Sequence, residues 1–299
     1  MYPAPTRTRV ARRWGVLGLS IAVAAGAVVL ARPEVMGVLY VPDTTAAPAG
    51  LAAAAVAAAQ GATGPATELG VAVLDRATGE IATGRLGEQP FYAASVAKLV
   101  VAADVLDRRR SDGLAVGDAD LELVRHALGP SDDNAMNQLW TRFDGPGAAG
   151  RTAVRLGLTG TGGPSARSQW GEMLAPAVDV VRIWAHVLDE LPAADRDTLL
   201  VPMNTAPPRA ADGFDQQFGL RSTTVDGPGA PGAIAKQGWM CCVSDMYYLH
   251  STGVVGQDQR FVIALLTRMP RGEGWTAARG ELDTIAAAAV DALHPTRLS

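Results

Sequence analysis

Apolar residues recur along this 299-residue chain with spacings that change from helical to strand-like and back again. Leu51–Gln60 is nearly all alanine, which favours a helix. Two short apolar runs then flank a turn that ends in Gly79, and this pattern predicts a β-hairpin with strands at Leu69–Leu74 and Glu80–Thr83. In residues 95–109 the apolar positions lie three and four apart, which predicts a helix with one buried face.

The later part of the chain first continues in helices and then returns to strands. Residues 115–191 are rich in helical patterns and contain no convincing strand, and an alanine-rich helix is predicted at Thr276–Leu293. We therefore expect an α+β fold, in which an antiparallel five-stranded sheet is flanked by the N- and C-terminal helices and a helical domain is inserted at about 99–220. The late strands are expected at Ile234–Val243, Met246–Gly253 and Arg260–Arg268.

The first 50 residues differ from the rest in composition. Trp14–Leu30 is an unbroken run of apolar residues, glycine and serine behind a cluster of arginines, so residues 1–32 are predicted to be an export signal or a membrane anchor. Residues 33–50 are rich in proline, threonine and alanine and are expected to form a flexible linker. Positive charge before the apolar run would place the body of the protein outside the cell membrane, either anchored there or secreted after cleavage.

Charge argues against nucleic acid as a partner. The chain has a net charge of −4, although its first 32 residues carry five arginines and no acidic residue. The remaining chain is therefore clearly acidic, and an acidic body has no electrostatic reason to bind nucleic acid.

Cysteine and histidine usage predicts neither a metal site nor a cofactor. The four histidines lie far apart along the chain, and none pairs with a cysteine at ligand spacing. The two cysteines, Cys241 and Cys242, are neighbours. Adjacent Cα atoms are about 3.8 Å apart, which is shorter than ordinary disulfides use. We therefore expect two unpaired thiols on opposite faces of a strand.

Candidate chemistry begins at Ser95 and Lys98, where the first long helix is predicted to start. Residues three apart on a helix share a face, so the Lys98 amine can lie beside the Ser95 hydroxyl. A serine hydroxyl needs a base to become a nucleophile, and a buried lysine can supply one because burial lowers the pKa of its amine. Of the 26 basic residues, only Lys98 and Lys236 are lysines. Arginine cannot lose its proton, so this usage indicates that the amine itself is needed at both positions.

Three motifs together resemble those of a known family. Ser95-Val-Ala-Lys98, Ser131-Asp-Asp133 and Lys236-Gln-Gly238 are similar to the S-x-x-K, S-D-N and K-T-G motifs of penicillin-binding proteins and class A β-lactamases, and they occur in that family's order. The run Leu69–Gly79 resembles the family's first hairpin. The resemblance covers most of residues 51–299, which it implies to be one β-lactamase-like serine hydrolase domain.

The resemblance implies a role for each motif residue. Ser95 would be the nucleophile and Lys98 its general base or proton relay, while Ser131 would pass a proton to the leaving nitrogen. Lys236 would hold Ser131 and attract a substrate carboxylate. The backbone N–H groups of Ser95 and Trp239 would form the oxyanion hole. Substrate-binding positions would be Asp133, Gln237, Gly238 and Trp239.

This chain departs from the family pattern at three places. Asp133 replaces a neutral asparagine that binds the acyl side chain of the substrate, and Gln237 replaces a small hydroxyl residue. The loop at about 165–176 lacks the pattern that supplies the family's efficient β-lactamases with a carboxylate for deacylation. Glu172 is the only acid in that loop and lies several residues too late, so a solvated carboxylate is the simpler interpretation of it.

These observations leave three hypotheses for function. The first is a serine hydrolase that forms an acyl-enzyme with a β-lactam or a D-alanyl peptide of the cell wall and deacylates slowly. The second is a non-hydrolytic cell-wall-binding or scaffolding protein that retains the fold, and the third is an esterase on the same scaffold. In each case we expect a monomer whose partners are a small-molecule or peptidoglycan-peptide substrate and, through the N-terminal segment, the membrane.

Overall fold

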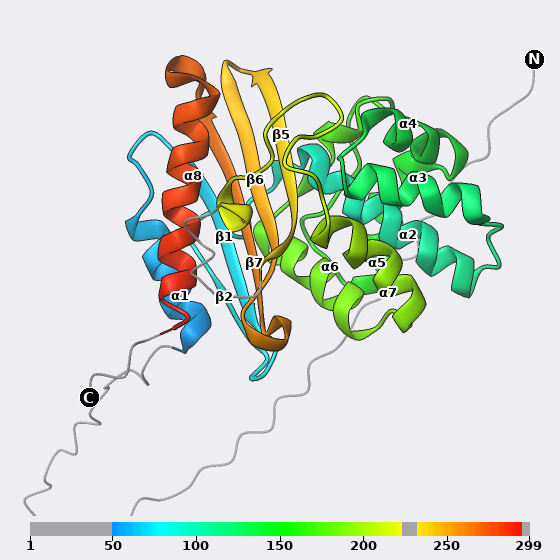
Figure 1. Ribbon diagram of the computed structural model, residues 1–299, viewed down its shortest axis with the longest axis horizontal. Helices are drawn as coiled ribbons and strands as arrows, with labels where there is room; N and C mark the ends of the chain where they lie inside the picture. The colour runs from blue at the N-terminus through cyan, green and yellow to red at the C-terminus, as the bar shows by residue number, and fades with distance from the viewer. Residues whose placement is uncertain (1–49, 223–231, 295–299) are drawn as a thin grey trace, which may run out of the picture. The chain divides into compact units, whose positions relative to one another are not determined.

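A five-stranded antiparallel sheet forms the centre of the fold, as a computed structural model that describes residues 50–222 and 232–294 shows (Figure 1). The strands lie in the order β2-β1-β7-β6-β5, and each neighbouring pair is antiparallel. The predicted α+β fold with an antiparallel five-stranded sheet is confirmed. The strands are β1 (Glu68–Asp75), β2 (Glu80–Thr83), β5 (Ile234–Val243), β6 (Met246–Val255) and β7 (Phe261–Pro270).

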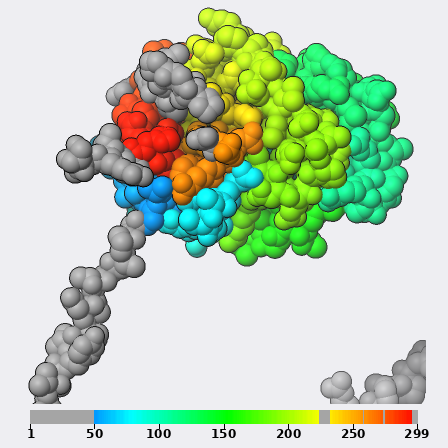
Figure 2. Space-filling model, turned by 60° about the horizontal axis from the view of Figure 1, so that its bottom comes forward, coloured from blue at the N-terminus to red at the C-terminus, as the bar shows by residue number. Residues whose placement is uncertain are grey.

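Helices cover both faces of this sheet. The first and last helices of the described chain, α1 (Leu51–Gly61) and α8 (Gly274–Asp291), lie side by side on one face (Figures 1 and 2). The other face packs against the helices that lie between β2 and β5 in the chain. Those helices are α2 (Ala97–Ser111), α3 (Asp118–Leu128), α4 (Asp133–Arg142), α5 (Gly145–Leu156), α6 (Ala177–Asp189) and α7 (Ala193–Asn204).

The neighbouring inner strands β1 and β7 are buried on both faces, which explains their nearly continuous apolar sequence. Successive side chains of a strand point to opposite faces. Val71 and Val73 of β1 therefore pack with α1 and α8, whereas Ala72 and Leu74 pack with the helical part. Alternate side chains of β1 thus belong to the hydrophobic cores on the two faces of the sheet. A shift of β1 by one residue would exchange them, so this packing fixes the register of the strand.

A short pair of strands was not expected from the sequence. β3 (Phe91–Tyr92) precedes the candidate nucleophile and pairs with β4 (Leu174–Ala175), which lies in the helix-rich region where no convincing strand was predicted. Two residues per strand are too few to produce a recognisable alternation. The pairing holds the loop around Glu172 next to the segment that leads into Ser95.

The other predicted elements are confirmed with small changes at their ends. The hairpin, the late strands and the two terminal helices lie where the apolar patterns placed them. The predicted boundaries of signal, linker and hydrolase domain remain predictions. The apolar run Trp14–Leu30 lies outside the described residues, and within residues 50–222 and 232–294 no helix is both long and apolar enough to cross a membrane.

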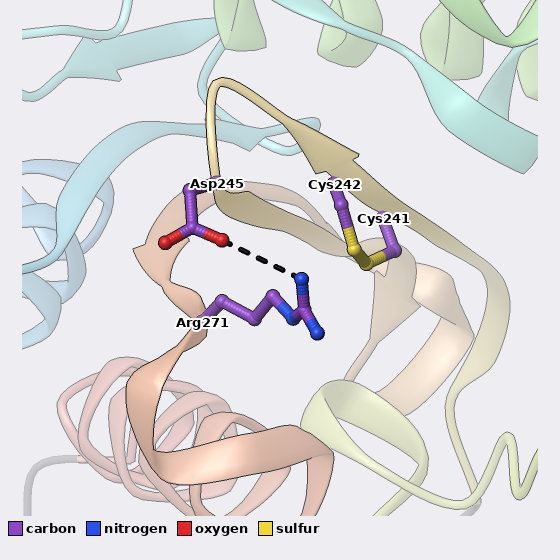
Figure 3. Close-up of a disulfide and its surroundings, with 4 residues drawn as sticks. All are labelled: Cys241, Cys242, Asp245 and Arg271. Carbon is purple, nitrogen blue, oxygen red and sulfur yellow. Dashed lines mark ion pairs between the residues drawn. A yellow bond between two sulfur atoms is a disulfide. The ribbon is translucent and has the colours of Figure 1, made fainter.

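The prediction of two unpaired thiols is wrong, because Cys241 and Cys242 form a disulfide near the end of β5 (Figure 3). The prediction assumed an extended chain with a trans peptide bond, whereas the bond between these residues is cis. Both cysteines are exposed. The turn that follows is joined to the end of β7 by an ion pair between Asp245 and Arg271, with 3.6 Å between the charged atoms.

Candidate active site

Ser95 lies in a short 3₁₀ turn, η1 (Ala94–Val96), which leads directly into α2. Its side chain is buried, and so is that of Lys98 one turn further along. The Lys98 amine donates a hydrogen bond to Ser95 Oγ at 3.1 Å. The spacing of three residues therefore places the hydroxyl and the amine in contact, as the sequence predicts. A neutral amine at this distance can accept the proton of the serine.

Ser131 lies in the loop between α3 and α4, and its backbone is left-handed with φ of 55°. Such a conformation is uncommon for a residue other than glycine. The next residue, Asp132, fixes the end of this loop to α4. Its carboxylate caps the helix by accepting hydrogen bonds from the backbone nitrogens of Asn134 and Ala135. Lys98 donates to both the backbone oxygen of Ser131 at 2.6 Å and its Oγ at 3.1 Å. The loop thus presents the Ser131 hydroxyl to Lys98.

Lys236 approaches the same hydroxyl from the sheet. It lies on β5, is fully buried and donates to Ser131 Oγ at 2.9 Å. A second hydrogen bond of 2.9 Å goes to the backbone oxygen of Gln237. The Ser131 hydroxyl therefore lies between the two lysine amines of the chain. Ser95, Lys98, Ser131 and Lys236 form one continuous hydrogen-bonded series.

Burial changes the proton affinity of both amines. It lowers the pKa of Lys98, while the neighbouring Asp133 carboxylate partly offsets the effect. It lowers the pKa of Lys236 well below its usual range, and the charges of Lys98 and Arg221 act in the same direction. Two close cations in a buried site repel each other, so the loss of one proton from the pair is favoured. The pair can therefore hold a neutral amine, which is the form that a general base requires.

Asp133 forms an ion pair with Lys98, with 2.6 Å between Oδ1 and the amine. The Lys98 side chain is fully buried, whereas that of Asp133 is 59% exposed. A carboxylate at this distance stabilises the protonated form of Lys98. The substitution that sets this chain apart from the family pattern therefore acts directly on the candidate base.

Replacing Asp133 with asparagine should extend acylation to lower pH. Acylation needs neutral Lys98, so its rate rises as pH increases through the pKa of Lys98. Removing the carboxylate lowers that pKa further, and the acidic limb of the pH–rate profile of acylation should move to lower pH. Asp212→Asn is a graded control, because Asp212 raises the same pKa by a smaller amount. An unchanged or upward-shifted limb in the Asp133 variant would contradict this role.

A cleft of about 330 Å³ opens beside this series. Two tryptophans line it: Trp170 lies with its ring centroid 4.9 Å from the Lys98 amine, and Trp239 stacks on Phe214 at 4.7 Å. Trp170 Nε1 donates to Asn137 Oδ1 at 2.9 Å, so the ring is fixed from the side of α4. The lining residues are Ala94, Asp133, Asn137, Ser168, Gln169, Trp170, Gly171, Trp239 and Met240.

The predicted substrate-binding residues of β5 do not all reach this cleft. Lys236 and Gly238 face Ser131 and Ser95, whereas Gln237 between them is buried on the opposite face and donates to the backbone oxygen of Phe218. A side-chain carbon at Gly238 would lie only 3.3 Å from the backbone nitrogen of Ser95. Glycine therefore permits β5 to run close to the nucleophile, as an oxyanion hole shared by the two segments requires.

Glu172 belongs to a different pocket from the nucleophile. It ends the 3₁₀ turn η2 (Trp170–Glu172), whose first two residues line the cleft. Glu172 itself lines a separate polar pocket of about 330 Å³, which also contains Glu68, Tyr248 and Arg268. The structure does not bring this carboxylate into the cleft beside Ser95.

Two features of the site were missed by sequence reasoning. Asp212 accepts a hydrogen bond from Trp239 Nε1 at 3.0 Å and contributes negative charge near Lys98. Phe214 supplies the ring on which Trp239 stacks. Both residues lie in an irregular segment between α7 and β5, and no local pattern could reveal which strand that segment approaches. In the described part of the chain, no group of three or more His, Cys, Asp or Glu side chains could hold a metal ion.

The fold is that of class A serine β-lactamases. A β-lactamase from Burkholderia vietnamiensis superposes with a TM-score of 0.63 at 20% identity, covering 84% of this chain and all of the other. A class A β-lactamase from Mycobacterium abscessus gives 0.58 at 19% identity and covers 81% and 97%. At this level of identity the likeness concerns the fold alone.

The chain belongs to the same family as the mycobacterial protein named "Putative lipoprotein LppW". The proteins of this name from Mycobacterium tuberculosis and Mycobacterium bovis are 32% identical to this chain over 225 residues, which cover 74% of this chain and 68% of theirs. No protein-family model matches the chain.

Proposed function

We propose that this protein is an exported serine hydrolase that forms an acyl-enzyme at Ser95 with β-lactams or D-alanyl cell-wall peptides and releases it slowly. One observation carries the proposal: the buried hydrogen-bonded series from Ser95 through Lys98 and Ser131 to Lys236. Buried lysines are rare unless paired, and here both contact one serine hydroxyl. A purely structural role would not require an amine rather than a guanidinium at both positions.

Acylation follows from this geometry in three proton transfers. Ser95 Oγ attacks the substrate carbonyl carbon while its proton passes to the neutral amine of Lys98. The carbon–nitrogen bond then breaks, and the leaving nitrogen takes a proton from Ser131 Oγ. Lys98 returns the proton to Ser131 across 3.1 Å, so the enzyme regains its starting state with Ser95 esterified. Lys236 remains beside Ser131 and stabilises its oxygen while the proton is in transit.

Deacylation lacks an equivalent base. It requires a water molecule activated beside the ester, and Glu172, the only acid of the loop at 165–176, lines another pocket. Loss of a general base typically reduces a rate by about 10² to 10⁴. We therefore expect an acyl-enzyme that accumulates and persists.

Intact-mass measurement after incubation with a penicillin tests the proposal and the slow release together. One equivalent of the adduct should appear on the protein and remain for minutes or longer after free penicillin is removed. Glu172→Gln should change the adduct lifetime less than twofold, since its carboxylate lies in another pocket. Rapid turnover by the wild type, with adduct accumulating only in the Glu172 variant, would show that this residue is the deacylation base.

The ion pair between Asp133 and Lys98 favours a second candidate function. By holding Lys98 protonated, the carboxylate opposes its action as a base, and a protein that binds cell-wall peptides without cleaving them would tolerate this. Equilibrium binding of a D-alanyl peptide without any mass adduct, from either the peptide or a penicillin, would support this second function and exclude the first.

We further propose that the protein is held at the outer face of the cell membrane by Trp14–Leu30. The relatives' name indicates a lipoprotein, but the first 50 residues of this chain contain no cysteine to which a lipid could be attached. The apolar run itself is then the anchor. The protein should sediment with membranes, and its body should be cleaved by protease added to spheroplasts. A soluble form that starts between Ala31 and Ala66 would instead show a cleaved signal.

A further inference from the structure

Asp133 is the only charged side chain among the described residues that line the cleft. Its Oδ1 is used by Lys98 at 2.6 Å, and within the described residues Oδ2 makes no hydrogen bond. The side chain is 59% exposed, so this second oxygen is open to a ligand that enters the cleft. A carboxylate oxygen in such a position accepts from a donor and attracts positive charge.

The cleft lies on the acyl side of the candidate nucleophile. In the proposed mechanism Ser131 protonates the leaving nitrogen, Lys236 holds Ser131, and the charge of Arg221 acts on Lys236 on that side. None of these three residues lines the cleft. The acyl portion of a substrate therefore extends away from them, into the space bordered by Asp133 and Trp170.

Two further features of the cleft suit a cation. Trp170 and Trp239 line the same space, and tryptophan is the aromatic side chain that attracts cations most strongly. The other polar side chains that the structure describes along the cleft are neutral, so none of them competes with Asp133 for positive charge.

We infer that the substrates of this site carry a protonated amine on the acyl side of the bond that is cleaved, as in a peptide or ester whose acyl residue is itself acylated by an amino acid with a free amino group. The inference rests on the proposed function. The ammonium group binds Asp133 Oδ2 near the indole of Trp170, a few bonds along the acyl portion from the carbonyl carbon that Ser95 attacks. A substrate with a carboxylate at the same place is repelled.

The same charge also activates the base. A cation bound to Asp133 weakens the stabilisation that this carboxylate gives to protonated Lys98, and the cation repels that proton directly. Lys98 is then neutral in a larger fraction of complexes, so Ser95 can transfer its proton. The substrate amine thus increases the rate of acylation as well as the affinity. Asp133 opposes the action of Lys98 as a base in the free protein, but not when a cationic substrate is bound.

Three penicillins test this inference because they differ in charge only at the carbon next to the side-chain carbonyl. Benzylpenicillin has no charge there, ampicillin an ammonium group and carbenicillin a carboxylate. At pH 6.5 an α-amino group is protonated. In each case Ser95 Oγ bonds to the lactam carbonyl carbon, the carbon–nitrogen bond breaks and the serine proton ends on the lactam nitrogen. The rate constant for adduct formation is measured by intact mass or by competition with a fluorescent penicillin.

We expect ampicillin to acylate the protein about tenfold faster than benzylpenicillin, and carbenicillin about tenfold slower, as for one charged contact in a half-exposed site. In Asp133→Asn the three rates should fall within about threefold of one another. Glu172→Gln is the matched control, because it removes an acid from the separate pocket, and it should keep the wild-type order. Equal acylation rates for the three penicillins in the wild type would overturn the inference. So would an order of rates in Asp133→Asn that is the same as in the wild type.

Equilibrium binding to Ser95→Ala separates this inference from the proposed function. The variant cannot be acylated, so the affinities of the three penicillins report charge preference alone, and we expect the same order. If the wild type forms no adduct but Ser95→Ala shows this order, the proposed function fails and the charge preference stands. If adducts form but the three penicillins do not differ in acylation rate or in affinity, only the inference fails.

Discussion

Replacing Ser95 with alanine should abolish covalent labelling of the protein by a fluorescent penicillin. The acyl bond can form only at a nucleophilic oxygen, and this variant removes the oxygen while leaving Lys98, Ser131 and Lys236 in place. The change deletes one buried atom from η1, so the fold should be retained. Far-UV circular dichroism and the melting temperature check that retention.

Ser168→Ala is the matched control for this experiment. Ser168 lines the cleft, but no hydrogen bond joins its hydroxyl to either lysine within the described residues. Labelling of this variant should remain within twofold of wild type. Undiminished labelling of Ser95→Ala would remove Ser95 from the mechanism, and equal loss in both variants would indicate damage to the cleft rather than loss of a nucleophile.

The fold was predictable because its elements carry strong local patterns. The hairpin around Gly79 combines two apolar strands with a turn, and the alanine-rich helices at both ends are long enough to be distinguished from strands. The failures lie where local pattern is weak. The strands Phe91–Tyr92 and Leu174–Ala175 are two residues each, and the geometry of the Cys241–Cys242 bond departs from the extended strand that was assumed.

The candidate site was predictable in its members but not in its contacts. Residues three apart on a helix must meet, so the pairing of Ser95 with Lys98 follows from sequence alone. The position of Ser131 between two amines depends on how β5 approaches the loop before α4, which no local pattern encodes. The same is true of the ion pair between Asp133 and Lys98, residues 35 apart in the chain. Sequence could show that Asp133 was unusual, but only the fold shows that it contacts the candidate base.

Lys98→Arg should reduce the rate of acylation by about 10² to 10⁴, the usual effect of losing a general base. Arginine keeps the positive charge and can still pair with Asp133, so any role of Lys98 as a simple cation would survive the change. It cannot give up a proton at accessible pH, however, and so it cannot accept one from Ser95. The acidic limb of the pH–rate profile, which reports the pKa of Lys98 in the wild type, should disappear in this variant.

Lys236→Arg should lower acylation less, by about tenfold, because Lys236 holds Ser131 through a hydrogen bond that the bulkier guanidinium disturbs but does not abolish, and it does not accept the serine proton. Both lysines are fully buried, and the larger guanidinium will strain its surroundings by about 1 to 3 kcal/mol. Melting temperatures of the two variants therefore need to be compared. Lys98→Ala provides a test that is free of overpacking, because a small primary amine added to the solution should partly restore its acylation. Wild-type acylation by Lys98→Arg, or a larger loss in Lys236→Arg at equal stability, would show that Lys98 is not the base.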